Sequence, residues 1–200
     1  MTEMFDQALA CDANWKGPEL ARSDSWIHTL TSGEMAELDA ALAHVKSRGL
    51  EIPNITRDDF PLPTLAPVLA GILEEIESGH GVKVLRGVPV ARLGEADATL
   101  VYWGIGTHLG TVPAQNMMGE LLGHVRAIGG DWDQNFKIRG YQSPSHLPYH
   151  SDKGDVVGLL CLEVAKSGGL SCFASSVAVH NEILKRRPDL LKVLYEEFHI

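Results

Sequence analysis

The sequence has 200 residues, of which 44% are hydrophobic, and this length suffices for one domain with a buried core. Its 26 acidic residues outnumber 17 Lys and Arg, giving a formal net charge of −9, and the scattered basic residues make nucleic acid an unsuitable partner. No apolar run is long enough to span a membrane, and the N-terminus lacks the basic and apolar regions of a secretion signal. The three cysteines show no C-x-x-C spacing, as is usual in a reducing compartment. We therefore expect a globular, cytoplasmic protein that binds neither nucleic acid nor membranes.

The first 80 residues are expected to form a helical segment. Residues 31–34, Thr-Ser-Gly-Glu, have the form of a capping box, and the apolar residues that follow recur at helical spacing until Gly49. This pattern predicts a helix over residues 32–48. A second broad apolar face predicts another helix from residue 64 to residue 78. Residues 15–27 are expected to be irregular.

The pattern changes after residue 80, where short alternating or continuous apolar runs predict strands. We expect strands at residues 82–86, 121–128, 156–164 and 170–175, and helices at residues 96–109, 177–187 and from Pro188 onward. Residues 129–145 are expected to be a loop. Residues 1–200 would then form a single domain of the α+β class, in which the helical segment 1–80 packs on a core made from residues 81–200.

A His-x-Asp motif at residues 150–152 is the strongest candidate for a metal site. The segment around the motif is predicted to be a strand, in which residues two apart project from the same face, so His150 and Asp152 could hold one metal ion. A second match, His180 with Glu182, lies in a predicted helix, where residues two apart diverge around the axis. About one such match is expected by chance. The motif alone is therefore also consistent with a polar strand end and an ordinary hydrogen-bonded histidine.

The sequence around the motif resembles the TauD/TfdA family of iron(II)- and 2-oxoglutarate-dependent dioxygenases. The segments that carry the resemblance are residues 139–142, 150–152, 155–159, 168–171 and 175–177, with looser similarity at 81–89 and 99–109. The resemblance implies a double-stranded β-helix, a jelly-roll or cupin-like core, with flanking helices. It also implies Fe(II) as the metal and 2-oxoglutarate as the co-substrate.

The resemblance assigns roles to individual residues. His150 and Asp152 would be two of three iron ligands, and Ser171 would help to bind 2-oxoglutarate. Gly168 and Gly169 would form the tight turn that positions Ser171. Alternatively, Ser171 is a half-buried strand serine that hydrogen-bonds to the backbone.

The implied reaction is the hydroxylation of a small organic molecule by O2, with release of succinate and CO2 from 2-oxoglutarate. Asp152 argues against halogenation, in which this carboxylate is replaced. Gln115, Asn116 and Arg139 lie upstream of the motif and either contact the substrate or hold a loop in place.

The chain departs from the family pattern in one important respect. The third iron ligand of the family is a histidine about a hundred residues downstream of the motif, followed by an arginine that binds 2-oxoglutarate, and this sequence contains neither. His199 falls where no ligand is expected. The predicted strands are also fewer than the roughly eight that close a jelly roll. We therefore expect a core that is incomplete at the C-terminus.

Two other functions stay open at this point. The chain could be a non-catalytic or split metal-binding subunit of the same fold, completed by a partner chain, or a homo-oligomer. A zinc-dependent hydrolase that uses His150 and Asp152 is less well supported, because the sequence has no H-E-x-x-H or other hydrolase motif.

Overall fold

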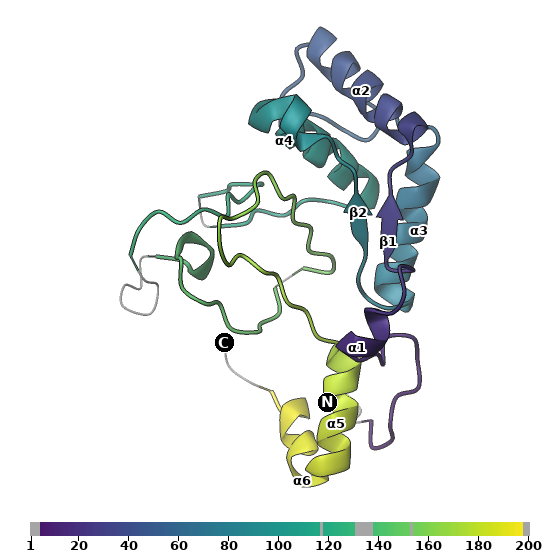
Figure 1. Cartoon of the computed structure of the whole chain (residues 1–200), viewed down its shortest axis with the longest axis vertical. Helices are drawn as coiled ribbons and strands as arrows, with labels where there is room; N and C mark the ends of the chain where they lie inside the picture. Colours follow the sequence, from purple (N-terminus) through teal and green to yellow (C-terminus); the bar gives the residue numbers. More distant parts are fainter. Residues whose placement is uncertain (1–4, 117, 131–137, 153, 198–200) are drawn as a thin grey trace. The chain divides into compact units, whose positions relative to one another are not determined.

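The computed structural model describes residues 5–116, 118–130, 138–152 and 154–197 (Figure 1). They divide into a helical unit, Met1–Leu109 with Leu160–Ile200, and a loop unit, Gly110–Leu159. Each unit is described by itself. The elements in chain order are α1 (Gly17–Leu20), β1 (Ile27–Thr29), α2 (Ser32–Ser47), α3 (Leu65–Ser78), β2 (Val84–Arg86), α4 (Val90–Leu109), η1 (Gly140–Gln142), α5 (Ser176–Arg186), α6 (Pro188–Leu191) and η2 (Lys192–Tyr195).

Helix α2 begins at the predicted capping box. The Thr31 hydroxyl accepts a hydrogen bond from the Glu34 backbone N–H at 3.2 Å, and the Glu34 carboxylate accepts one from the Thr31 backbone N–H at 2.7 Å. The helix ends before Gly49, whose φ of 62° lies in the left-handed region that favours glycine. Glu34 is buried, and His28 Nε2 of β1 lies 3.1 Å from its Oε1. The helix predicted at 32–48 is therefore confirmed.

The core of the helical unit lies between α2, α3 and α4 and the segment that joins α2 to α3. Phe60 of this segment is fully buried, and its ring contacts the backbone of Gly104 in α4 so closely that a Cβ at residue 104 would overlap it. The segment is also tied to α4 by two side chains that bind its backbone carbonyls. Trp103 Nε1 donates to Ile55 O at 2.9 Å, and His108 Nε2 donates to Phe60 O at 2.7 Å. The other buried apolar side chains of these elements are Leu38, Ala41, Leu42, Val45, Leu62, Leu65, Leu69, Ile72, Ala98, Val101 and Ile105.

The other predicted helices are also formed. Helices α3, α5 and α6 match the predicted segments within about two residues. Helix α4 contains the predicted residues 96–109 and is broken at Gly94, which has a φ of 71°. None of the helices in the described part of the chain is long and apolar enough to cross a membrane.

The described strands are short and differ from the prediction. The strand predicted at 82–86 is confirmed as β2, which pairs in parallel with β1, and Ile27 is the partner of Val84. Strand β1 was not predicted, because three residues are too few to show alternation. The strands predicted at 121–128, 156–164 and 170–175 are not formed, and these segments are irregular.

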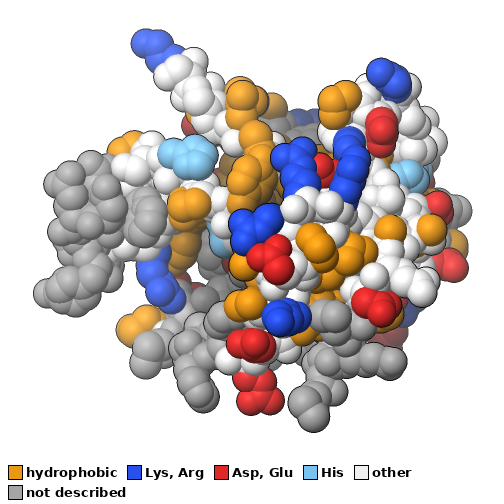
Figure 2. All heavy atoms as spheres, turned by 90° about the horizontal axis from the view of Figure 1, so that it is seen from below, with side chains coloured by type: hydrophobic (Ala, Val, Ile, Leu, Met, Phe, Trp, Pro, Cys, Tyr) orange, Lys and Arg blue, Asp and Glu red, His pale blue; other side chains and the backbone are white. Residues whose placement is uncertain are grey.

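The lack of neighbouring strands among the described residues explains why these segments are irregular. A strand is stabilised by backbone hydrogen bonds to a neighbouring strand, and the only ladder in the described residues joins β1 and β2. Without such partners, Val164 and Leu170 are about nine-tenths exposed. Figure 2 shows hydrophobic side chains exposed among charged ones on one face of the molecule. The described residues thus form a mixed helical structure with few strands, and the double-stranded β-helix stays a prediction.

The contact between Phe60 and Gly104 can be tested with two substitutions in the same helix. Gly104→Ala should lower the free energy of unfolding by about 1–3 kcal/mol, because the methyl group overlaps the buried ring. Gly106→Ala is the control, because a Cβ there meets nothing within 4 Å and alanine favours a helix by up to about 1 kcal/mol. Urea denaturation measures both, and equal stabilities of the two variants would contradict the packing described.

The capping box should make stability depend on pH. Hydrogen bonds from the Thr31 backbone and hydroxyl, together with His28, lower the pKa of Glu34 against the opposing effect of burial. A lowered pKa contributes stability above the unfolded-state value near 4.5, and this contribution is lost as the pH falls through the folded-state pKa. Glu34→Gln should therefore destabilise the protein at pH 7 and approach wild type in acid. Glu74→Gln, at an exposed position of α3, is the control and should show no such pH dependence in thermal denaturation.

Candidate metal site

His150 and Asp152 lie together in the loop unit. His150 Nδ1 is 2.8 Å from Pro148 O, so Nδ1–H donates to this carbonyl and Nε2 is the ring nitrogen that remains for a metal ion. Nε2 lies 3.9 Å from Asp152 Oδ1. Two adjacent ligands on one metal ion, each bonded at about 2.1 Å, are about 3 Å apart. The separation of 3.9 Å is thus about 1 Å longer than that of two ligands on one ion.

The pair is accessible to a ligand. The side chains of His150 and Asp152 are 51% and 58% exposed, so neither is held in the protein core. The surrounding segment is irregular, so the two side chains converge through local loop geometry instead of the predicted strand. Among the described residues, no group of three or more His, Cys, Asp or Glu could hold a metal ion. Metal binding by His150 and Asp152 therefore stays a prediction, and His199 lies outside the residues that the structure describes.

The second His-x-acid match has a different environment. His180 and Glu182 lie in α5, as predicted. Glu182 is paired with Arg186 at 2.5 Å and with Lys16 at 3.8 Å, and the Arg186 hydrogen bond is the main cause of its lowered pKa. His180 instead packs edge-to-face against Tyr195. Glu182 is thus engaged with two cations, whereas among the described residues His180 Nε2 is buried without a hydrogen-bond partner.

Ser171 belongs to the helical unit, after the predicted glycine turn. Gly168 and Gly169 have φ values of 72° and 68°, which confirms that both adopt the left-handed conformation. Ser171 is exposed, and its hydroxyl makes no hydrogen bond within the described part of the chain. The alternative of a half-buried serine bonded to the backbone is therefore not what the structure contains.

The remaining predicted site residues stabilise turns of the loop unit. Asn116 Oδ1 accepts hydrogen bonds from Met118 N at 3.0 Å and Glu120 N at 3.2 Å, and Gln115 Nε2 donates to Pro113 O at 2.9 Å. Arg139 N donates to the Gln142 side chain at 3.1 Å, which opens η1. Contact of Gln115, Asn116 or Arg139 with a substrate stays a prediction.

Two features near the site residues were not predicted from the sequence. One is the carbonyl of Pro148, which orients His150 from two residues upstream. The other is an aromatic cluster around Phe173, two residues after Ser171, made with Trp15 and Trp26. The sequence contained no signal for the cluster, because its members are far apart along the chain.

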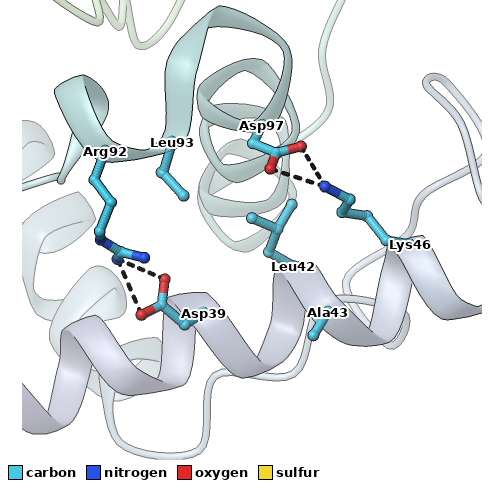
Figure 3. Close-up of a pocket in the computed structure, with 7 residues that line it drawn as sticks. All are labelled: Asp39, Leu42, Ala43, Lys46, Arg92, Leu93 and Asp97. Atoms are coloured by element: carbon cyan, nitrogen blue, oxygen red, sulfur yellow. Dashed lines mark hydrogen bonds and ion pairs between the residues drawn. The ribbon is translucent and has the colours of Figure 1, made fainter.

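A hollow between α2 and α4 is a separate feature of the helical unit (Figure 3). Its charged side chains form two ion pairs, Arg92 with Asp39 at 2.7 Å and Lys46 with Asp97 at 2.8 Å. Leu42, Ala43 and Leu93 line the space between the pairs. Because each of these charges already has a partner, the hollow offers no free charged group to a ligand.

Comparison with known proteins places the chain among oxygenases. The family model described as "Taurine catabolism dioxygenase TauD, TfdA family" matches residues 47–200. The chain is 33% identical over 195 residues to FR-33289 synthase of Streptomyces rubellomurinus, covering 98% of this chain and 58% of that protein. It is 30% identical over 190 residues to taurine hydroxylase-like protein SAT17 of Stachybotrys chartarum, covering 92% of this chain and 49% of that protein. The chain thus spans about half the length of the curated relatives it matches.

Proposed function

Because the chain belongs to the TauD/TfdA family, whose members are iron- and 2-oxoglutarate-dependent dioxygenases, we propose that it is the part of such an enzyme that contributes His150 and Asp152 as iron ligands. The observation that supports this most directly is the orientation of His150. Its Nδ1–H donates a hydrogen bond to Pro148 O, and its Nε2 lies 3.9 Å from Asp152 Oδ1. Metal-bound histidines characteristically donate their other ring N–H to such a carbonyl.

The two side chains are of the types that bind Fe(II) in the family to which the chain belongs. One imidazole and one carboxylate are two of the three ligands in the non-haem iron triad, which leaves positions open for a 2-oxo acid and O2. Bound Fe(II) and 2-oxoglutarate would supply the oxidant for a C–H bond of a small organic substrate, with release of succinate and CO2. The Asp152 carboxylate contributes the negative charge that offsets the cation, and the Pro148 carbonyl fixes the His150 tautomer that can bind it.

Ser171 is the proposed contact for the co-substrate. Its exposed hydroxyl is free, within the described residues, to donate a hydrogen bond to the distal carboxylate of 2-oxoglutarate. Gln115, Asn116 and Arg139 are proposed substrate contacts through the parts of their side chains that the turns do not use. The names of the relatives, a synthase and a hydroxylase-like protein, support oxidation of a small molecule.

The third iron ligand, the arginine that binds 2-oxoglutarate and the remaining strands of the jelly roll would come from outside the described residues. The relatives are about twice as long as the aligned segment, which is consistent with this proposal. A second chain could supply the same groups, and the protein would then be a metal-binding subunit that is inactive alone.

The proposal is tested by anaerobic titration of the full-length protein with Fe(II) and 2-oxoglutarate. A weak visible charge-transfer band is expected when the 2-oxo acid chelates protein-bound iron. His150→Ala and Asp152→Ala should each weaken Fe(II) binding at least about tenfold and remove the band. His146→Ala is the matched control, because His146 is an exposed histidine of the same loop unit and should leave the band unchanged.

Two results would count against this function. Fe(II) affinities equal to wild type in both ligand variants would mean that the pair does not bind the metal. Turnover supported by Zn²⁺ in preference to Fe(II) would instead favour the hydrolase.

A further inference from the structure

The N-terminal segment of the helical unit is hydrogen-bonded to α5 and to the residue that caps it. Leu9 N donates to Asn181 Oδ1, and Asn181 Nδ2 donates to Leu9 O, each at 2.8 Å. Ser175 caps α5 by accepting from Ala178 N at 2.9 Å, and its hydroxyl donates to Ala13 O. Figure 1 shows the purple N-terminal segment beside α5. Residues 9–13 are thus attached to the middle of α5 and to its N-cap, Ser175.

The same N-terminal region holds Phe173 through its ring. Phe173 lies edge-to-face with Trp15 and with Trp26, and both pairs of ring centroids are 6.0 Å apart. Each indole is itself fixed by a hydrogen bond to the backbone. Trp15 Nε1 donates to His80 O and Trp26 Nε1 donates to Ser23 O, each at 2.7 Å. Phe173 is therefore held between two anchored rings.

Little else restrains the segment that carries Ser171. Residues 170–175 form no strand, and Leu170, Ser171 and Cys172 are all exposed. Within the described residues, the side-chain restraints on this segment are the ring contacts of Phe173 and the hydrogen bonds of Ser175. Because Phe173 is only two residues from Ser171, loss of its ring contacts would let the serine move.

We propose that Trp15 is a positioning residue for co-substrate binding, which acts by holding Phe173 and thereby fixing Ser171. This inference rests on the proposed function, in which Ser171 donates to 2-oxoglutarate. Trp15 contacts neither the metal pair nor the co-substrate in this proposal. It should therefore influence the affinity for 2-oxoglutarate and leave the rate at saturation unchanged.

The test uses Trp15→Ala in the full-length enzyme. The KM for 2-oxoglutarate should rise about two- to tenfold, the change that corresponds to losing one edge-to-face contact. The kcat at saturating 2-oxoglutarate and the Fe(II) affinity should stay at wild-type values. Amide hydrogen exchange of residues 170–175, measured without metal or co-substrate, should become faster, and this readout does not depend on activity.

Two milder variants separate positioning from general stability. Trp15→Phe keeps a ring beside Phe173 but loses the bond to His80 O, so its KM should lie between wild type and Trp15→Ala. Trp103→Phe loses an equivalent indole bond, to Ile55 O in the helical core, and should lower the melting temperature without changing the KM or the exchange of residues 170–175. If Trp15→Ala fails to fold, the comparison of the two Phe variants decides.

The outcomes distinguish this inference from the proposed function. A wild-type charge-transfer band with an unchanged KM in the Trp15 variants would overturn the positioning role and leave the dioxygenase function in place. An equal rise in KM for Trp103→Phe would also overturn it, because the effect would then be one of stability. Absence of the band in the wild-type full-length enzyme would overturn the function and the role of Trp15 together.

Discussion

The close approach of α4 to the segment between α2 and α3 is the constraint on which the helical unit depends. Phe60 can be fully buried because residue 104 has no side chain, and the ring occupies the space that a Cβ would fill. The backbone carbonyls of Ile55 and Phe60 would otherwise be removed from water without a hydrogen-bond partner. They accept hydrogen bonds from the side chains of Trp103 and His108. An irregular segment is thereby made part of the core, and the apolar faces of three helices are covered.

Helices were predictable because their determinants are local. The capping box that begins α2 and the left-handed glycine that follows it lie within one stretch of sequence, and the backbone hydrogen bonds of a helix are internal. The predictions of strands failed because the determinants of a strand are not local. Residues 156–164 and 170–175 have the apolar character of strands, but a strand requires a second segment to pair with, and periodicity does not say where that segment is. The short β1 was not predicted because its three residues show no alternation, and because its partner, β2, follows only after α2 and α3 in the sequence.

The same distinction between local and long-range determinants applies to the candidate site. The left-handed turn at Gly168 and Gly169 was predictable, because a positive φ is a property of the residue itself. The proximity of His150 and Asp152 was predicted from strand geometry, yet it arises in a loop in which the Pro148 carbonyl orients the imidazole. In this loop the spacing of two residues leaves His150 Nε2 and Asp152 Oδ1 3.9 Å apart, whereas in α5 residues two apart diverge around the helix axis. The cluster of Trp15, Trp26 and Phe173 could not be read from spacing, because it depends on tertiary packing.

Mutations are expected to affect the proposed metal ligands, His150 and Asp152, differently from the proposed co-substrate contact, Ser171. Among the described residues, the hydrogen bond of His150 and its 3.9 Å approach to Asp152 both lie within residues 148–152. Ser171 follows the turn at Gly168 and Gly169, which forms locally. It precedes Phe173 and Ser175, which contact the N-terminal region. Changes in residues 9–15 should then alter co-substrate affinity without altering the metal ligands. The N-terminal region, which precedes the residues matched by the family model, would thus contribute to the affinity of the site for its co-substrate.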